Sequence, residues 1–504
     1  MPAIEYPNLS PAAAKSNWRR FLQFMPVAVV TLVLATAISP QGFWIDEAAT
    51  GTIVCQPTLA GWWRAILNDQ GSTQMMPLYL VYGWVWEKIF GHGEWWLRLS
   101  NLPWLVLGLL AIPRKQILFL GIVVVSPFAW YYLNEFRPYA MQFGAGFVLL
   151  GSLCRLTEIT EQQKNTGPEK FWAMAFCFGL VMLSGSSLLG MIWGGAGVAV
   201  IIVTLGSTES LRLLRQNMPT FIVTGSLSAA LAVYYLWSLK HSNGATPGVT
   251  GIGSTLFIFY ELFGFAGLGP SRAQLHTGDL STLEPFIPEL ALYTMVLACL
   301  LLAGTKHIIQ IAPRCVWSGV VWVLGMAVLL LLGLGVVKHF RVLGRHFAPL
   351  LPVLICWMAC GIRELWSRGK WARLLVVLFI LLNLLSSVSL RFAGRHIKDD
   401  YREAAAVAVA AHARGERVWW CADGWTGRYY GLSLSPMHES AAPGQIWLAV
   451  DALESMLTNQ PPADLIVLSK PEIHDKDGLL QAYMAGHRYK LVQTFPVFTL
   501  WRRE

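Results

Sequence analysis

Apolar runs long enough to cross a lipid bilayer recur along most of this chain, and they constrain its fold more than any other feature. The bilayer core offers the backbone no hydrogen-bonding partner, so a segment that crosses it must be a helix or part of a closed barrel. Runs of about twenty apolar residues suit a helix. Only 13% of the 504 residues are charged, about half the fraction usual in soluble domains. The sequence therefore predicts a polytopic α-helical membrane protein.

About 11 membrane spans are expected from the apolar segments. The first, residues 21–38, follows a basic segment and has no small-residue cleavage site after it, which predicts an anchor and not a cleaved signal peptide. We treat 77–112 as a single net crossing, because two crossings would place Arg114 and Lys115 on the wrong side. The apolar segments after the first are 77–91, 101–112, 116–133, 138–154, 171–188, 189–205, 219–239, 288–304, 315–337, 347–362 and 372–390.

The positive charges between these segments set the expected orientation. Lysine and arginine accumulate in cytoplasmic loops, so the net charge of +9 indicates topology and not nucleic-acid binding. A first outer loop, 39–76, and a long outer loop, 240–287, then lie on the extracytoplasmic side of a cytoplasmic (inner) membrane. The cytoplasmic set is Arg114, Lys115, Lys164, Lys170, Arg212, Arg215, Lys306, Arg314, Arg363, Arg368, Lys370 and Arg373.

The composition changes near residue 391, where charges become frequent and apolar runs become short. This change divides the chain into a membrane domain, 1–390, and a small domain, 391–504, which the topology places outside. Helical and strand-like patterns alternate in the second part and predict an α/β fold. We expect a helix over 400–413 and strands over 417–422, 465–469, 490–495 and 498–501.

The eight cysteines show no metal-ligand spacing. Most lie within apolar runs, where a buried thiol behaves as a small apolar side chain. Cys55 and Cys421 both fall on the expected outer side, and the sequence leaves a disulfide between them open.

Asp46 and Glu47 stand side by side just after the first span. A carboxylate at the edge of a membrane is costly unless it is paired or used, and such residues are rare. In one interpretation the pair is satisfied by water or by Arg64. In the other, which the rarity favours, the pair is a general base or a cation site at the outer face.

Two further groups of charged residues lie at expected outer ends of spans. Glu135, Arg137 and Tyr139 lie around Pro138. They form either a structural Glu-Arg pair within an aromatic belt, or a site in which Arg137 contacts an anionic group or the acidic pair. The second group is basic, although it lies outside, and this predicts a phosphate-binding loop. A solvated charge run or a site for anionic headgroups are the alternatives. The second group is Lys338, His339, Arg341, Arg345 and His346.

Several short motifs occur along the chain in a characteristic order. An Asp-Glu pair follows the first span, Met-Pro-Leu-Tyr opens the next apolar stretch at 76–79, and Trp-Leu-Arg-Leu-Ser follows at 96–100. Later motifs are Glu-Phe-Arg-Pro-Tyr-Ala at 135–140 and Arg-His-Phe-Ala-Pro-Leu-Leu-Pro at 345–352. Together they resemble the protein O-mannosyltransferase-like family of the GT-C superfamily of membrane glycosyltransferases, which includes the aminoarabinose transferases.

The resemblance implies a sugar donor linked to polyprenyl phosphate and an extracytoplasmic acceptor that is a glycan, a lipid or a protein. Asp46, with Glu47 beside it, would be the catalytic base of a single inverting displacement. Cations must receive the phosphate leaving group. No cofactor is required, although a divalent metal held by Asp46, Glu47 and Glu135 is left open. The donor-phosphate residues would be Arg137, Lys338, Arg341, Arg345 and His346, with Glu135 and Tyr139 supporting them.

One position departs from the family pattern. Many relatives carry His or Lys just ahead of the Pro-Leu-Tyr segment, where this chain has Gln74, Met75 and Met76. The phosphate contact must then come from elsewhere, such as the 338–346 loop, or the donor differs, or the chain is an inactive member. A transporter or flippase for lipid-linked sugars and a non-catalytic subunit of a polysaccharide assembly system are the rivals. A transporter favours charged or broken helices at the midplane and an inverted repeat, and the sequence shows neither.

Overall fold

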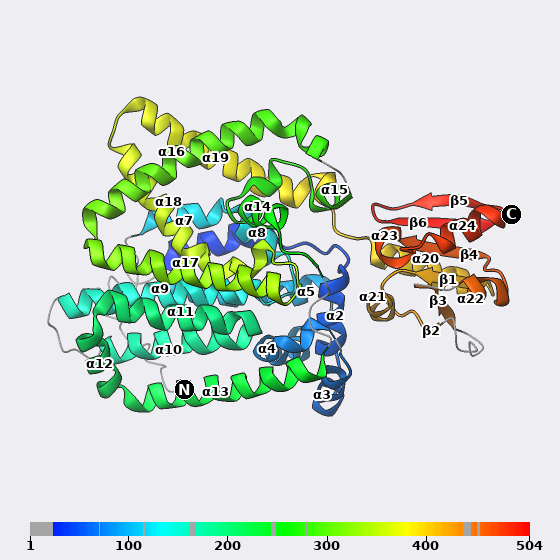
Figure 1. Ribbon diagram of the computed structural model, residues 1–504, viewed down its shortest axis with the longest axis horizontal. Coiled ribbons are helices and arrows are strands. Elements are labelled where there is room, and N and C mark those ends of the chain that lie inside the picture. Colours follow the sequence, from blue (N-terminus) through cyan, green and yellow to red (C-terminus); the bar gives the residue numbers. More distant parts are fainter. Residues whose placement is uncertain are drawn as a thin grey trace, which may run out of the picture.

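The computed structural model consists of a helical bundle followed by a smaller unit built on a β-sheet (Figure 1). It describes residues 24–69, 71–113, 116–161, 168–242, 248–277, 280–436, 445–450 and 454–504. The bundle ends with helix α19, and the sheet unit begins with helix α20.

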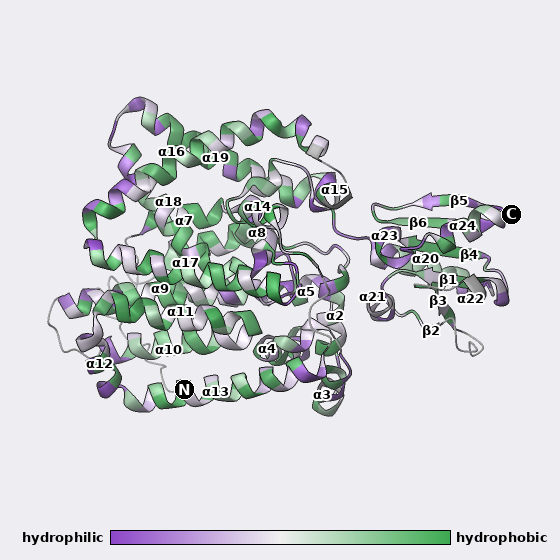
Figure 2. Ribbon diagram, in the orientation of Figure 1, coloured by the Kyte–Doolittle hydropathy of each residue, from purple (hydrophilic) through white to green (hydrophobic). Residues whose placement is uncertain are grey.

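Seven helices in the described part of the chain are long and apolar enough to cross a membrane. Figure 2 shows hydrophobic residues along their length. The prediction of a polytopic helical membrane protein is confirmed, whereas the count of about 11 spans is not. The seven are α9 (Tyr139–Glu161), α11 (Leu188–Leu205), α13 (Met218–His241), η3 with α16 (Leu280–Phe286 and Ile287–Ile311), α17 (Arg314–Val337), η4 with α18 (Gly344–Leu350 and Leu351–Trp366) and α19 (Lys370–Phe392).

Shorter helices fill the remaining described part of the bundle. The helices α4 and α6 have 14 and 11 residues, fewer than the roughly 20 that a crossing needs. The shorter elements are Phe24–Ala35, α2 (Ile45–Val54), α3 (Leu59–Asn68), η1 (Ser72–Met75), α4 (Pro77–Phe90), α5 (Glu94–Leu99), α6 (Asn101–Ala111), α7 (Ile117–Val124), α8 (Pro127–Leu133), α10 (Pro168–Ser186), α12 (Ser207–Gln216), α14 (Ile252–Leu262), η2 (Phe265–Gly267), α15 (Arg272–Thr277) and η5 (Gly394–His396).

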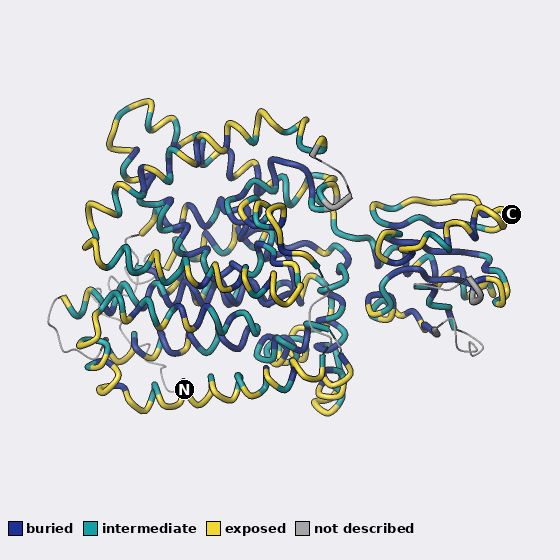
Figure 3. The backbone as a smooth tube through the Cα atoms, in the orientation of Figure 1, coloured by how far each residue is buried: buried dark blue, intermediate teal, exposed yellow. Residues whose placement is uncertain are grey.

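Many residues of the outer helices are exposed (yellow in Figure 3), and a number of them have large apolar side chains. Val233 of α13 and Trp322 of α17 are 67% and 71% exposed. A soluble protein scatters such residues singly, whereas a membrane protein turns them toward lipid. The centre of the bundle is α9, which is buried along most of its length between α6 and α10.

Small residues let α6 and α9 approach each other closely. A Cβ built on Gly144 of α9 would lie 2.5 Å from the Trp104 carbonyl oxygen of α6. Gly151, two turns later, faces the Ala111 carbonyl in the same way. Because backbone atoms line both contacts, a side chain there forces the helices apart.

The C-terminal unit is a six-stranded sheet in the order β2-β3-β1-β4-β6-β5. The first four strands of that order are parallel, and β6 and β5 add an antiparallel hairpin. Trp420 packs with helix α20 on one face, and Trp419 packs with α24 on the other. The elements are α20 (Tyr401–Ala413), β1 (Val418–Cys421), α21 (Gly424–Tyr429), β2 (Leu434–Pro436), β3 (Ile446–Leu448), α22 (Glu454–Asn459), β4 (Leu465–Ser469), α23 (Pro471–His474), α24 (Leu479–Gly486), β5 (Tyr489–Thr494) and β6 (Phe498–Arg503).

The predicted α/β fold of this unit is confirmed, and each predicted helix and strand is present, although β2 and β3 were not predicted. The carboxyl ends of β1 and β4 lead into α21 and α23, on the side nearest the bundle (Figure 1). There α21 packs against α2. No disulfide joins the described residues Cys55 and Cys421. The Cys421 thiol instead donates to the His474 carbonyl.

We expect Gly144→Ala to destabilise the bundle, because the added methyl group overlaps the Trp104 carbonyl oxygen. Such overpacking typically costs about 1–3 kcal/mol. Thermal unfolding in detergent measures the loss. Gly195→Ala in α11 is the matched control, since a Cβ there meets nothing within 4 Å. Equal melting temperatures for the two variants would contradict the close crossing of α6 and α9.

Candidate active site at the end of the bundle

Helix α2 places both acidic residues at the end of the bundle that faces the sheet unit (Figure 1). Asp46 and Glu47 lie in its first turn, where carboxylates interact favourably with the helix dipole. Successive helical residues point about 100° apart. The two side chains therefore enter different surroundings.

Glu47 is fully buried and fully hydrogen-bonded. Its Oε1 accepts from Arg98 Nε at 2.8 Å and from the Phe136 amide at 2.7 Å. Its Oε2 accepts from Arg98 Nη2 at 2.7 Å and from Lys398 Nζ at 3.0 Å. A carboxylate has about four acceptor positions, and donors occupy all of them. Glu47 is thus a structural anchor, and it has no lone pair left to take a proton or a hydrogen bond from a substrate.

Burial alone would raise the pKa of Glu47, but the charges of Arg98 and Lys398 outweigh it and lower the pKa to about 2. The carboxylate is therefore more stable in the folded protein than in the unfolded one. Its contribution is fully present above the ordinary pKa and is lost as pH falls from there toward 2.

Asp46 remains accessible, since its side chain is 29% exposed. Its Oδ2 accepts from Arg345 Nη1 at 2.8 Å. Burial favours a higher pKa, yet the charges of Arg345 and Arg137 hold the pKa of Asp46 below its ordinary value. Arg64, the partner considered in the sequence, donates instead to the Ala60 carbonyl. Asp46 is the acidic residue that a substrate can reach.

Two arginines converge beside Asp46. Arg137 Nη1 donates to Thr50 Oγ1 at 2.9 Å and to the Asp46 carbonyl at 3.2 Å. The Arg345 guanidinium lies 5.7 Å from the ring centroids of Trp44 and of Tyr139. The buried Nε atoms of both arginines donate to no described residue. The site therefore holds two charged donors without a partner.

Glu135 lies behind this pair and is fully buried. Arg272 Nη1 lies 3.8 Å from its Oε1. Burial raises the pKa of Glu135, although the charges of Lys398 and Arg272 oppose the rise.

The region between α13 and α16 contacts the turn that carries Arg345. Glu261 of α14 accepts the Gly344 amide at 2.9 Å, and its carboxylate also pairs with Arg272. The Arg272 guanidinium stacks over Tyr131 at 4.1 Å and donates to the Tyr132 hydroxyl at 2.6 Å. These contacts fix the turn from which Arg345 projects.

The predicted basic loop divides into two parts. Arg345 faces Asp46, whereas Lys338 and Arg341 are exposed and form no ion pair with a described residue. His346 is half-buried, and its Nδ1 accepts the Leu343 amide at 3.2 Å. Of this predicted phosphate set, the structure brings Arg137 and Arg345 together with Asp46.

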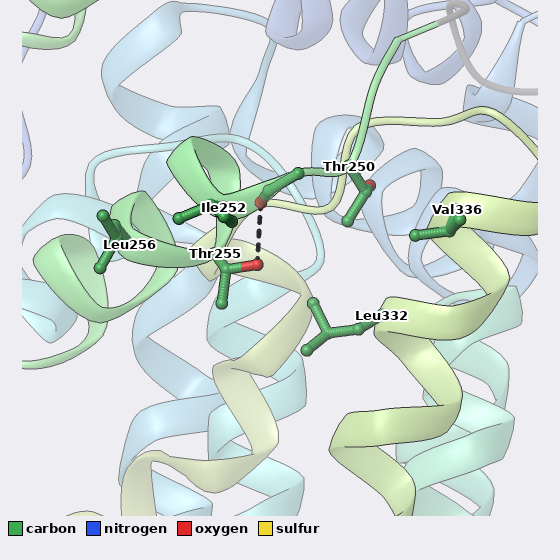
Figure 4. A pocket seen from close by; sticks show the side chains of 7 residues that line it. Thr250, Ile252, Thr255, Leu256, Leu332 and Val336 are labelled. Carbon is green, nitrogen blue, oxygen red and sulfur yellow. Dashed lines mark hydrogen bonds between the residues drawn. The ribbon is translucent and has the colours of Figure 1, made fainter.

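An apolar hollow of about 330 Å³ lies between α14 and α17, next to the exposed part of the basic loop (Figure 4). Ile252 and Leu256 line it from α14, and Leu332 and Val336 from α17. The Val342 amide donates to Thr250 Oγ1 at its edge. The hollow is therefore joined to the loop that ends at Arg345.

Gln74, the first residue of the Gln74–Met76 stretch that departs from the expected pattern, is buried. Its Oε1 accepts from Ser238 Oγ at 3.0 Å, and its amide nitrogen donates to the Asp69 carbonyl. Gln74 is thus a neutral structural residue.

Three charged residues of this site carried no role in the sequence analysis: Arg98, Lys398 and Arg272. Arg98 lies within a quoted motif and Arg272 within a predicted outer loop, so motif position was the available signal for both. No local signal pointed to Lys398.

Within the described ranges, no group of three His, Cys, Asp or Glu side chains is placed to hold a metal ion.

We expect Glu47→Gln and Asp46→Asn to differ sharply in stability. Removing the charge of Glu47 leaves Arg98 and Lys398 buried without their counterion, a loss of about 3–5 kcal/mol. Asp46 is partly exposed and has one ionic partner, so its change is within about 1 kcal/mol. Thermal unfolding of both variants in the same detergent tests this. Similar melting temperatures would contradict the view that Glu47 is a structural anchor and Asp46 is not.

No model of a protein family matches the sequence, and no curated protein matches it. Several solved structures are similar, among them the following three. ArnT from Cupriavidus metallidurans in the apo state is 12% identical, covers 97% of this chain and 98% of its own, and has a TM-score of 0.52. ArnT bound to undecaprenyl phosphate is 12% identical, covers 95% and 97%, and has a TM-score of 0.48. The oligosaccharyltransferase AglB from Archaeoglobus fulgidus, in complex with an inhibitory peptide and a dolichol-phosphate, is 9% identical, covers 97% and 75%, and has a TM-score of 0.48.

The fold assignment rests on the first of these structures, which is similar over nearly the whole of both chains. At 12% identity the similarity concerns the fold alone. The chain therefore has the fold of the GT-C membrane glycosyltransferases, as its motifs predicted.

Proposed function

We propose that the protein is an integral-membrane glycosyltransferase that moves a sugar from a polyprenyl-phosphate donor to a hydroxyl group of an extracytoplasmic acceptor. The observation that carries the proposal is an accessible Asp46 paired with Arg345 beside Arg137, where each arginine keeps a buried Nε donor that no described residue accepts. ArnT, whose apo form shares this fold, has also been solved with undecaprenyl phosphate bound, and we carry that class of ligand to this chain.

The donor phosphate would lie between Arg345 and Arg137. Guanidinium groups bind phosphate oxygens through paired N–H donors, and here each group has an Nε–H without an acceptor in the described part of the chain. Glu261 and Arg272 hold the turn before Arg345, so the phosphate meets a cation whose position is already fixed. Preorganised donors of this kind need no rearrangement when charge develops.

The lipid chain of the donor would lie in the apolar hollow between α14 and α17. Isoprenoid chains require an apolar surface open to the membrane, and the lining residues supply it. Lys338 and Arg341 are exposed in the basic loop beside this hollow. Their charges would attract anionic headgroups or the approaching donor phosphate.

The arriving phosphate would compete with Asp46 for Arg345. The negative charge of the phosphate offsets the charge of Arg345 without moving it, so the pKa of Asp46 rises and Asp46 becomes a better proton acceptor. The acceptor hydroxyl then gives its proton to Asp46 while its oxygen attacks the anomeric carbon. The bond from that carbon to the phosphate oxygen breaks, and polyprenyl phosphate leaves with the bonding electrons. A single displacement of this kind inverts the anomeric centre.

The other residues of the site would support this step. Glu47 fixes the helix that carries Asp46, and Tyr139 flanks the Arg345 guanidinium. Glu135 adds a buried carboxylate behind the arginines, which opposes their positive charge and limits how tightly the product phosphate is held.

We expect Asp46→Asn to reduce sugar transfer by about 10²–10⁴-fold, the usual contribution of a general base. The assay uses protein reconstituted in liposomes, a panel of polyprenyl-phosphate sugars, and release of polyprenyl phosphate as the readout. Asp464→Asn, in an exposed pair with Arg417 on the sheet unit, is the control and should retain activity. If wild type and Asp46→Asn bind a donor equally and neither turns it over, the proposal is contradicted, and a transporter or an assembly subunit is favoured.

We expect Leu332→Trp to fill the hollow and to raise KM for the lipid donor about tenfold, which corresponds to roughly 1.4 kcal/mol of binding. Leu329→Trp adds the same bulk one turn earlier on α17, at a position 61% exposed and outside the hollow. Its KM should stay at the wild-type value. If both variants behave alike, the hollow does not bind the donor chain.

A further inference from the structure

The segment that joins the bundle to the sheet unit reaches back into the site. It runs from η5 to the start of α20, and the side chain of Lys398 within it is only 9% exposed. Its Nζ donates to Glu47 Oε2 at 3.0 Å and to the Asn134 carbonyl. A residue 351 positions away in sequence thus completes the hydrogen bonding of Glu47.

The sheet unit also holds the stretch that leads into α2. Arg402 of α20 donates to the Pro40 carbonyl at 2.9 Å and to Glu94 at 3.1 Å. The hydroxyl of Tyr430, which follows α21, accepts the Phe43 amide. On the bundle side, Arg98 donates to the carbonyls of residues 39, 41 and 42. The start of α2 is therefore clamped between the two units.

The charges that face Lys398 come from three elements of the bundle. Glu47 of α2 and Glu135 of the turn before α9 attract its ammonium, and Arg98 of α5 repels it. Both carboxylates are fully buried. Removal of the Lys398 charge leaves Arg98 to balance Glu47, and Glu135 loses a nearby cation. A buried carboxylate that loses its counterion moves or binds a proton.

We propose that Lys398 is a positioning residue for the transfer reaction: by completing the shell of Glu47 from the linker, it holds α2 in the orientation that presents Asp46 to the acceptor. The sheet unit is then part of the reaction centre, because its docking places the lysine. This inference rests on the function proposed above, since it assigns a purpose to the orientation of Asp46.

The contact gives the site a pH dependence with a defined sign. Burial lowers the pKa of Lys398 to about 8, although the charge of Glu47 offsets part of the effect. The ammonium is present below this pKa and is lost as pH rises through it. The positioning contact therefore weakens on the alkaline side, whereas an arginine in its place stays charged.

The experiment compares wild type with Lys398→Met and Lys398→Arg in liposomes, using the donor that the panel identifies. We expect Lys398→Met to lower kcat about tenfold or more, as misplacement of a reacting group does. KM for the donor should change less than about threefold, because Arg137, Arg345 and the hollow are untouched. Lys398→Arg should restore most of kcat and abolish the fall in kcat above pH 8.

Lys470→Met is the matched control, since it breaks the neighbouring ion pair with Asp399 of the linker and leaves Glu47 intact. It should retain kcat. A kcat for Lys398→Met close to wild type, or an alkaline fall that persists unchanged in Lys398→Arg, would overturn the proposal.

Hydrogen exchange separates this inference from the proposed function. The amides of residues 45–54 should exchange faster in Lys398→Met than in wild type or Lys470→Met. If wild type transfers no sugar from any donor, the proposed function fails, and faster exchange in Lys398→Met still supports the clamp. Equal exchange in all three proteins overturns the clamp whatever the activity.

Discussion

The buried carboxylate of Glu47 is the contact on which the arrangement of the site depends. Its donors come from α5, from the turn before α9 and from the linker to the sheet unit, so one side chain joins parts of the chain that hydropathy alone leaves independent. A carboxylate that is fully desolvated is tolerated only with complete pairing. Each partner is therefore required, and together they determine where α2 begins and how it is rotated.

That rotation explains why two adjacent acids have different tasks. In the sequence, Asp46 and Glu47 form one acidic pair, and both were predicted to be catalytic. Helical geometry turns them about 100° apart, so that one meets Arg98 in the interior and the other meets Arg345 at an accessible edge. The saturated residue supplies rigidity, and the accessible residue supplies chemistry. Sequence alone does not give this division, because it depends on which face of α2 is buried.

Local patterns predicted those features that depend on neighbouring residues. Apolar runs located the long helices, and the strand patterns of β1, β4, β5 and β6 were visible because each has at least four residues. The strands β2 and β3 have three residues each, too few for a period-two signal. Contacts between distant segments escaped prediction, above all Lys398 with Glu47. The basic loop was predicted as one anion site, but His339 has a positive φ of 53° where the chain turns after α17, and Arg341 is exposed while Arg345 faces inward.

The charges of the site form a set suited to a leaving group that gains charge. Its ion pairs join four cations to four carboxylates. Arg137, which donates to the Thr50 hydroxyl, adds a fifth cation. A lipid-linked sugar phosphate is a diester with one negative charge, which this excess balances. Cleavage turns it into a monoester with a second charge, so attraction to the fixed arginines grows along the reaction. An interaction that strengthens toward the transition state accelerates chemistry, whereas one equal in both states does not. The carboxylates that neutralise most of the cations have the matching effect of keeping the product releasable. The charges are Arg98, Arg137, Arg272, Arg345 and Lys398 against Asp46, Glu47, Glu135 and Glu261.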